Sequence, residues 1–256
     1  MDRAEYDKLD RLEDSMWWFA ATHANLLTLA RQFAEDAAAR NRVLDAGCGT
    51  GGLLAKLAAD RPQATVIGLD ADQQACERAA TKSARPVCRG SVNALPFAAA
   101  TLSAIFSADV LCHRDVDERQ ALGEFHRCLA PSGILVLNLP AYSWMLSRHD
   151  AAVYNVRRYT RSGIARLLGG AGFRLLYASY WNFVLFPIMV ITRKLLPGRD
   201  DGASDVRPYP ASIEALCRAV TGFERALLKR GLRLPFGGSL IAIAGKSAAV
   251  EDAAHA

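Results

Sequence analysis

A glycine-dense turn carries the strongest chemical signal in the sequence. Gly47, Gly49 and Gly51 follow a short apolar run at 42–47, and an apolar-periodic stretch begins directly after them. Glycine lets the backbone turn tightly and lets a ligand approach with no Cβ in the way. In an open α/β sheet, ligands bind beyond the carboxyl ends of the strands. The segment therefore predicts a ligand-binding loop between a buried strand and a helix.

Two acidic residues accompany this turn. Asp45 precedes the first glycine, where a carboxylate can orient the loop or bind a cationic amine, and Asp70 ends the next apolar run. A carboxylate at that second position can accept hydrogen bonds from both hydroxyls of a ribose. The spacing Asp-x-Gly-x-Gly-x-Gly differs from the Gly-x-Gly-x-x-Gly of dinucleotide-binding folds, which makes NAD binding a less favoured alternative. A structural turn with two surface acids is the other alternative.

Short apolar runs alternate with helix-like segments around the turn. The runs lie at 42–47, 65–70, 86–89, 102–109 and 133–139, with helix-like stretches at 51–60, 72–83 and 117–130. This alternation indicates βαβ units and a parallel sheet with helices on both faces. The runs are almost continuously apolar, as expected for strands that are buried on both sides. The predicted fold class is α/β.

The flanking segments are predicted to extend this core into one domain over 1–256. Two N-terminal helices are expected within 1–40, the second near 22–39, followed by a core at 41–180. This core is expected to end with a helix at 160–171 and a strand at 173–179. A helical cap is expected as an insertion at 181–238, with a helix at about 211–230, before a last strand at 239–247 and a frayed tail at 248–256. Trp17, Trp18 and Phe19 are either packing residues or part of a lid.

The composition limits the classes of protein to consider. With 256 residues, 51% of them hydrophobic and 22% charged, the chain can fold as one globular domain, which excludes wholesale disorder, collagen-like repeats and coiled coils. The net charge of +5 comes without a clustered basic stripe, so we expect no nucleic-acid partner. The six cysteines form no Cys-x-x-Cys pair and the histidines complete no zinc pattern, which predicts reduced thiols and no metal site.

The sequence predicts a cytoplasmic protein without a stable membrane span. Its amino terminus is charged and lacks the apolar core of a secretion signal. The best apolar candidate, Phe183 to Thr192, stops at Arg193-Lys194 and is shorter than the roughly 18–20 residues that span a bilayer. Peripheral contact of this segment with a membrane stays open.

The motif from Asp45 to Gly51 resembles motif I of the class I, seven-stranded S-adenosylmethionine-dependent methyltransferases, and the chain is similar to their methyltransferase type 11 group. The similarity continues at Asp70, at 90–97 after the third run, at 109–113 after the fourth and at the corner 117–133. It implies a Rossmann-like, mostly parallel seven-stranded sheet. It also implies S-adenosyl-L-methionine as the cofactor, with S-adenosyl-L-homocysteine as product.

The resemblance further implies which residues contact the cofactor. They are Asp45, Gly47, Cys48, Gly49, Gly51, Asp70, Ala71, Ser91, Val92 and Asp109. Ser91 departs from the family, which usually places an aspartate there to contact the adenine. A serine hydroxyl can still accept from the adenine amino group, or the contact passes to backbone and water.

Methyl transfer to oxygen or nitrogen can require a base within hydrogen-bond reach. His113, which follows the run at 102–109, and the adjacent His149 and Asp150, which follow the run at 133–139, are the candidate catalytic residues. Each could instead have a purely structural role, such as helix capping or packing. The sequence alone leaves these alternatives open.

Acceptor recognition is predicted for the long loop after 133–139 and for the start of the cap. Arg157 and Arg158 can bind a carboxylate or phosphate through their guanidinium forks, although a structural ion pair is the competing interpretation. Tyr142, Tyr154 and Trp181 add aromatic surface. The predicted function is methylation of a small, partly apolar and acidic molecule, with oxygen as the favoured acceptor atom. Alternatives are a lipid-linked acceptor at the membrane surface and a catalytically silent cofactor-binding protein.

Overall fold

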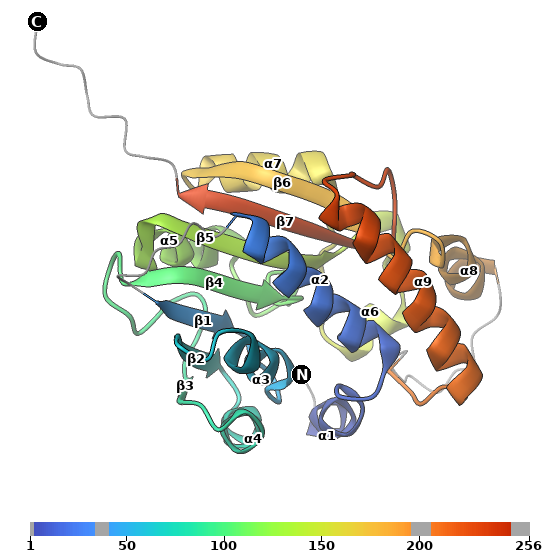
Figure 1. Cartoon of the computed structure of the whole chain (residues 1–256), viewed down its shortest axis with the longest axis horizontal. Coiled ribbons are helices and arrows are strands. Elements are labelled where there is room, and N and C mark those ends of the chain that lie inside the picture. The colour runs from blue at the N-terminus through green and yellow to red at the C-terminus, as the bar shows by residue number, and fades with distance from the viewer. Residues whose placement is uncertain (1–2, 34–40, 196–205, 247–256) are drawn as a thin grey trace, which may run out of the picture.

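The computed structural model describes residues 3–33, 41–195 and 206–246, and a seven-stranded sheet forms their centre (Figure 1). The strands are β1 (Arg42–Ala46), β2 (Thr65–Asp70), β3 (Val87–Arg89), β4 (Leu102–Ala108), β5 (Leu129–Pro140), β6 (Phe173–Trp181) and β7 (Ser239–Lys246). Their order is β3-β2-β1-β4-β5-β7-β6. Neighbours from β3 to β5 are parallel, and β7 runs antiparallel to both β5 and β6. The predicted Rossmann-like fold is confirmed.

The strand order reverses between β1 and β4, which are neighbours although the chain visits β2 and β3 between them. Such a switch point opens a crevice at the carboxyl edge of the sheet, because the connections from the two strands leave in opposite directions. The carboxyl ends of β5 and β6 lie at the same edge, since both strands run antiparallel to β7. The loops at this edge therefore form the candidate site.

Nine α-helices are defined in the described ranges. They are α1 (Arg3–Leu12), α2 (Trp17–Phe33), α3 (Gly52–Asp60), α4 (Gln73–Ser83), α5 (Glu118–Cys128), α6 (Arg148–Ala152), α7 (Arg161–Gly170), α8 (Phe186–Val190) and α9 (Ala211–Lys229). The second N-terminal helix begins at Trp17, earlier than the predicted 22, and its predicted end at 34–39 lies outside the described residues. None of the described helices is long and apolar enough to cross a bilayer.

Successive residues of a strand point to opposite faces of the sheet, which explains the continuous apolar runs. Leu44 of β1 and Ile105 of β4 belong to one core with α5 and α7. Val43 and Phe106 belong to a second core with α2, α3 and the end of α9. Because both faces are covered, only the edges of the sheet remain for a ligand.

The segment predicted as a cap divides between two places. α8 follows β6 at the carboxyl edge, whereas α9 lies along α2 on one face of the sheet (Figure 1). Two hydrogen bonds fix the pair of long helices: the Trp17 amide donates to Glu214 Oε2 at 2.7 Å, and Gln32 Nε2 donates to the Lys229 carbonyl at 2.6 Å. Only α8 and its neighbours are therefore close to the loops that follow β5.

Tyr159 connects the loop after β5 to the loop after β4. Its buried hydroxyl lies 2.9 Å from the Leu111 carbonyl oxygen and 2.8 Å from Glu118 Oε2. Tyr159→Phe should lower the free energy of unfolding by about 1–2 kcal/mol, because these acceptors would lose their donor without gaining water. Urea denaturation measures this, with Tyr209→Phe as the control, because Tyr209 is partly exposed and lies outside the core. Equal losses in both variants would contradict the connection.

Candidate active site

The glycine loop turns through three left-handed residues at the end of β1. Gly47, Gly49 and Gly51 have φ values of +81°, +53° and +96°. A Cβ on Gly47 would lie 2.3 Å from Val110 Cγ2, and one on Gly51 would lie 2.6 Å from the Ala79 Cα. The loop after β4 and helix α4 therefore pack directly on the glycine backbone. Larger residues at these two positions would push the elements of the site apart.

Asp70 holds the loop at the carboxyl end of β2. Its Oδ2 accepts from the Gly49 amide at 2.9 Å, and its Oδ1 accepts from the Asp72 amide at 3.0 Å. The Tyr6 hydroxyl of α1 also lies 3.4 Å from Oδ1. Burial raises the pKa of Asp70, while the two backbone amides oppose this effect. The carboxylate thus accepts a hydroxyl at the place where the sequence predicted ribose binding.

Asp45 is a buried carboxylate with an unsatisfied oxygen. It is 1% exposed, and its Oδ2 has no hydrogen-bond partner within residues 3–33, 41–195 and 206–246. Burial raises the pKa of Asp45 well above its usual range, and the nearby carboxylates of Glu13 and Asp70 raise it further. A cationic ligand group next to such a buried carboxyl group would favour its ionised form and lower its pKa.

Helix α1 and the residues after it cover the glycine loop. Glu13 accepts from Thr50 Oγ1 at 2.6 Å and from the Gly52 amide at 3.1 Å, at the start of α3. Leu9 Cδ2 lies 3.3 Å from the position that a Cβ on Gly49 would take. Tyr6, Leu9 and Glu13 were not predicted as site residues from the sequence, although acidic residues at helical spacing in this segment could have indicated a docked helix.

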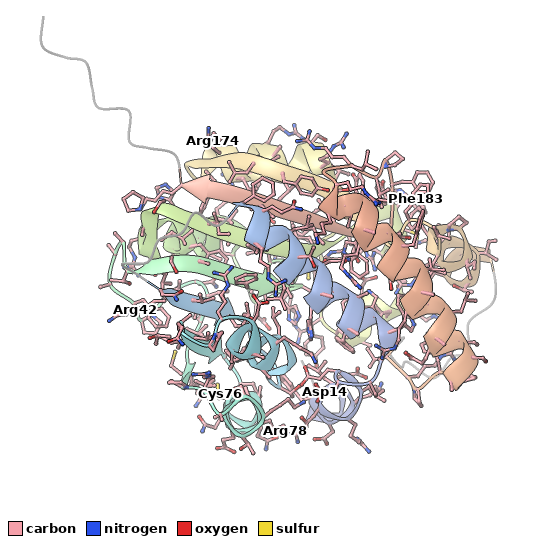
Figure 2. All side chains as sticks on the ribbon, viewed as in Figure 1. Asp14, Arg42, Cys76, Arg78, Arg174 and Phe183 are labelled. Atoms are coloured by element: carbon pink, nitrogen blue, oxygen red, sulfur yellow. The ribbon has the colours of Figure 1, made fainter. Side chains whose placement is uncertain are left out.

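An ion-pair network fastens this cover to α4. Lys82 Nζ pairs with Glu13 and lies 3.0 Å from Asp10 Oδ1 and 3.3 Å from Asp14 Oδ2, while Arg78 pairs with Asp7. In Figure 2, Arg78 lies on α4 and Asp14 lies just after the end of α1. The Arg78–Asp7 pair is partly exposed and contributes little by itself, whereas the Glu13 carboxylate that pairs with Lys82 is only 5% exposed, so this second pair is the stronger attachment of the cover.

The segment after β3 is brought next to Asp70. The Gly90 amide donates to the Asp70 carbonyl at 2.9 Å, Ser91 Oγ accepts from the Asn93 amide at 3.1 Å, and Val92 is buried. Cys48 is buried under the glycine loop and Ala71 is exposed at the end of β2. The residues predicted to contact the cofactor thus lie along the carboxyl edge from β3 to β4.

Asp109 follows β4 with φ +55° and is partly exposed. Its Oδ2 accepts from Asn138 Nδ2 at 2.9 Å, and Asn138 Oδ1 in turn accepts from the Trp181 indole at 2.8 Å. The sequence analysis gave no role to Asn138, because nothing in an apolar run marks one amide as functional. Trp181, predicted to face an acceptor, is fully buried and holds this amide.

The three candidate catalytic residues lie in different environments. His113 is half-buried, burial lowers its pKa to about 4, and its carbonyl oxygen accepts from Arg157. His149 and Asp150 lie in α6, where Asp150 is 1% exposed. Both Asp150 oxygens accept from Arg158, Nε and Nη2 each at 2.9 Å, and Oδ2 also accepts from the Ser147 amide.

The predicted arginine pair is engaged within the protein. Arg157 Nη2 donates to the carbonyls of His113 and Val116, and Arg158 pairs with Asp150 and donates to the Ala141 carbonyl at 3.1 Å. Tyr154 lies under the Arg114 guanidinium, 3.7 Å from carbon to ring centroid. These contacts join the loop after β5 to the loop after β4.

Aromatic rings gather after the carboxyl ends of β5 and β6. Tyr142 stacks on Tyr180 with 5.0 Å between centroids and on Trp144 with 5.8 Å, and Phe186 lies 5.7 Å from Tyr142. We call these four residues the aromatic wall. Trp144 is 54% exposed and Tyr142 is partly exposed, so these two rings present apolar surface to a ligand, while Tyr180 and Phe186 are buried. The sequence predicted acceptor recognition for Tyr142 and for the start of the cap, which contains Phe186, but it indicated no role for Trp144.

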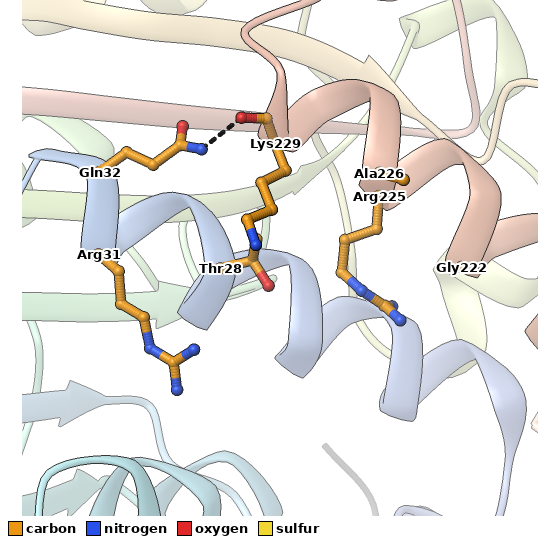
Figure 3. Close-up of a pocket in the computed structure, with 7 residues that line it drawn as sticks. All are labelled: Thr28, Arg31, Gln32, Gly222, Arg225, Ala226 and Lys229. Carbon is orange, nitrogen blue, oxygen red and sulfur yellow. Dashed lines mark hydrogen bonds between the residues drawn. The ribbon is translucent and has the colours of Figure 1, made fainter.

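Among the described residues no group of three or more histidine, cysteine or acidic side chains could hold a metal ion. A surface hollow of about 370 Å³ lies between α2 and α9 (Figure 3). Arg31, which lines it, pairs with Asp60 at the last turn of α3. Since α3 begins at the carboxyl edge of β1, this hollow lies toward the opposite edge and is separate from the glycine loop.

Comparison with known proteins places the chain in a family. A family profile described as a methyltransferase domain matches residues 44–137. A ubiquinone/menaquinone biosynthesis C-methyltransferase of Syntrophotalea carbinolica is 34% identical over 187 residues, covering 67% of this chain and 71% of that protein. A malonyl-[acyl-carrier protein] O-methyltransferase of Dechloromonas aromatica is 35% identical over 125 residues, covering 48% and 45%.

Solved structures show the same fold. A chain from the complex of the Haloferax volcanii Trm112 methyltransferase activator with a methyltransferase has a TM-score of 0.62 at 18% identity, covering 96% of this chain and 97% of its own. Geranyl diphosphate C-methyltransferase of Streptomyces coelicolor, in complex with S-adenosyl-L-homocysteine, has a TM-score of 0.57 at 13% identity, covering 86% and 78%. The chain belongs to the class I S-adenosylmethionine-dependent methyltransferases of the type 11 group, and S-adenosylmethionine is its cofactor.

The residues present fit this cofactor. The unsatisfied Asp45 Oδ2 can accept from an ammonium group, and Asp70 Oδ1 already accepts a hydroxyl as a ribose would offer. The Gly49 backbone faces a space that only Leu9 approaches closely. Tyr6 lies against Asp70 and Leu9 lies against Gly49, so α1 covers the place where the cofactor is expected to bind.

Gly49→Val should abolish cofactor binding, because its side chain would enter this space and valine strains a left-handed turn. Titration calorimetry with S-adenosylhomocysteine measures the affinity, and circular dichroism verifies folding. Gly123→Val is the matched control, since a Cβ at Gly123 meets nothing within 4 Å. A folded Gly49→Val protein that binds like the parent would mean that the loop does not hold the cofactor.

Asp45→Asn should stabilise the cofactor-free protein at neutral pH and weaken cofactor binding. Because the pKa of Asp45 is raised in the folded protein, its contribution to the free energy of unfolding is fully present below the unfolded pKa of 3.8. This contribution is lost as pH rises through the folded pKa. Asparagine removes that loss. Thermal melts from pH 5 to 8 should show a growing advantage for the variant, and calorimetry should show reduced affinity. A parent protein that is more stable at every pH would contradict this account.

Proposed function

We propose that this methyltransferase acts on a small, partly apolar acceptor that carries an oxygen nucleophile. The aromatic wall is the single observation that carries the apolar part, because it places stacked rings after the carboxyl ends of β5 and β6. Aromatic faces bind planar and apolar groups through burial and offset stacking. A partly acidic acceptor receives less support, since both predicted arginines already bind carbonyl or carboxylate groups of the protein.

In the proposed reaction the protein mainly positions the two reactants. When bound, S-adenosylmethionine supplies an electrophilic methyl group on a sulfonium. The glycine loop, Asp45 and Asp70 hold the cofactor at the switch point between β1 and β4. The aromatic wall and the loop after β5 hold the acceptor in line with the methyl group. Alignment at about 3 Å can contribute roughly 7–11 kcal/mol to lowering the barrier.

A lipid-linked acceptor at the membrane surface is the second candidate. The surface around α8 supports it, because Val184, Ile188 and Ile191 are exposed and precede Arg193 and Lys194. Apolar side chains followed by cations are typical of segments that rest on anionic membranes. The related quinone-pathway C-methyltransferase also acts, by its name, in the biosynthesis of apolar molecules.

A screen with methyl-labelled S-adenosylmethionine tests the proposed function. The parent protein and Gly49→Val are incubated with a metabolite library and, separately, with detergent-solubilised lipid extracts. Label in a water-soluble product only from the parent supports the proposal, and label only in the lipid extract favours the second candidate. Cofactor binding without turnover in either arm would favour the catalytically silent alternative.

Removing parts of the aromatic wall should weaken acceptor binding specifically. Trp144→Ala and Phe186→Ala are expected to raise KM for the acceptor found in the screen by about tenfold, the loss of roughly 1.4 kcal/mol of apolar contact. Affinity for S-adenosylhomocysteine should stay unchanged. Leu216→Ala, which removes an exposed apolar residue from α9, is the control. An unchanged KM in both wall variants would place the acceptor elsewhere.

A further inference from the structure

The carboxyl edge of the sheet concentrates backbone strain in non-glycine residues. Asp109 after β4, Tyr142 after β5 and Asn182 after β6 have φ values of +55°, +61° and +59°. The left-handed region is uncommon for residues that carry a Cβ, although aspartate and asparagine tolerate it better than tyrosine does. Such conformations tend to cluster where a side chain must point into a functional site. Of the three residues only Asp109 carries an ionisable group suited to proton transfer near neutral pH.

Two buried residues fix the orientation of the Asp109 carboxyl group. The Trp181 indole can only donate, so it must face Asn138 Oδ1, which it does at 2.8 Å. The amide nitrogen of Asn138 therefore faces Asp109, and it donates to Oδ2 at 2.9 Å. The Asp109 backbone amide also donates to the Asn138 carbonyl at 2.9 Å. Asn138 and Trp181 are both fully buried, so this arrangement is rigid.

The second oxygen of Asp109 is available. Oδ1 receives no hydrogen bond from any described part of the chain, and the residue is partly exposed. Val110, the next residue, packs on Gly47 of the cofactor loop. Asp109 therefore sits at the switch point between the cofactor loop and the strand ends that carry the aromatic wall.

We propose that Asp109 is the catalytic base of the methyl transfer and that Asn138 and Trp181 position it. The inference rests on the proposed function. The acceptor oxygen, or a nitrogen in its place, forms a bond to the methyl carbon. The bond from that carbon to sulfur breaks, and its electron pair stays on the sulfur of a neutral thioether. The acceptor proton moves to Asp109 Oδ1 and later leaves to water, which restores the carboxylate.

The electrostatic surroundings agree with this role. Burial and, more weakly, Asp150 raise the pKa of Asp109 to about 7, against the opposing effects of the Asn138 amide and Arg158. Cys112, whose thiol lies 3.2 Å from the Asp109 carbonyl oxygen, has a raised pKa and stays neutral. A base works best when its pKa lies near the working pH. Burial lowers the pKa of His113 to about 4, which makes it the weaker base.

Asp109→Asn tests the proposal through two independent measurements. In carboxyl-carbon NMR of aspartate-labelled protein, one resonance should titrate with a midpoint near 7 and be absent from the variant. With the acceptor from the screen, the variant should lose roughly 100-fold or more in kcat/KM, the usual scale for a missing base, together with the rising limb of the pH profile near 7. Because the family resemblance also implies a cofactor contact for Asp109, affinity for S-adenosylhomocysteine is measured in parallel, and the loss in kcat/KM should exceed any loss of that affinity at least tenfold. Asp115→Asn, an exposed acid after the same strand, is the matched control and should change nothing.

Trp181→Phe tests the positioning. Without the indole donor the Asn138 amide can turn its oxygen toward Asp109, which should move the NMR midpoint and the pH profile upward. Should this variant fail to fold, Asn138→Ala tests the same contact. An Asp109 resonance that titrates below pH 5, or an Asp109→Asn protein that transfers methyl groups like the parent, would overturn the inference. A parent protein that binds no S-adenosylhomocysteine would instead overturn the proposed function.

Discussion

Uncompensated negative charge at the carboxyl edge of the sheet is the constraint around which the site is organised. Asp45, Asp70 and Glu13 all have pKa values raised by burial, and of these three only Glu13 has a cationic partner in the described structure, Lys82. Bringing carboxylates out of water and close together is unfavourable unless a cation joins them. The cofactor of this family carries a sulfonium and an ammonium group, so its binding offsets a cost that folding leaves in place.

The glycine loop makes this charge accessible. Its left-handed turns let Val110 and α4 pack on the backbone while Gly49 donates its amide to Asp70. Helix α1 then covers the loop through Tyr6, Leu9 and Glu13 and is fastened to Arg78 and Lys82. Of these contacts the Glu13–Lys82 pair is the most buried, so loss of either partner should cost more than loss of the partly exposed Asp7–Arg78 pair.

Charge is handled differently in the loop after β5. Arg158 and Asp150 neutralise each other inside the protein, and Arg157 binds two backbone carbonyls of the loop after β4. Removing one partner of such a buried pair costs far more than the pair contributes. These contacts shape the loop, and they leave the aromatic wall and Asp109 as the groups that we propose face an acceptor. The residues that looked most reactive in the sequence are therefore largely structural in their contacts.

The sequence by itself determined the strands, the glycine loop and the two acids at its ends, because these depend on local properties: apolar periodicity, the conformational freedom of glycine and motif spacing. The boundary between α5 and β5 was predicted less well: a helix was expected up to residue 130 and a strand from 133, but β5 already begins at Leu129, which pairs with Leu102 ahead of a register shift. Only the tertiary structure decided that Asp150 pairs with Arg158, that Asn138 and Trp181 orient Asp109, and that α1 covers the loop. Those contacts join segments far apart in the chain or depend on which way a side chain points, and no local pattern encodes either.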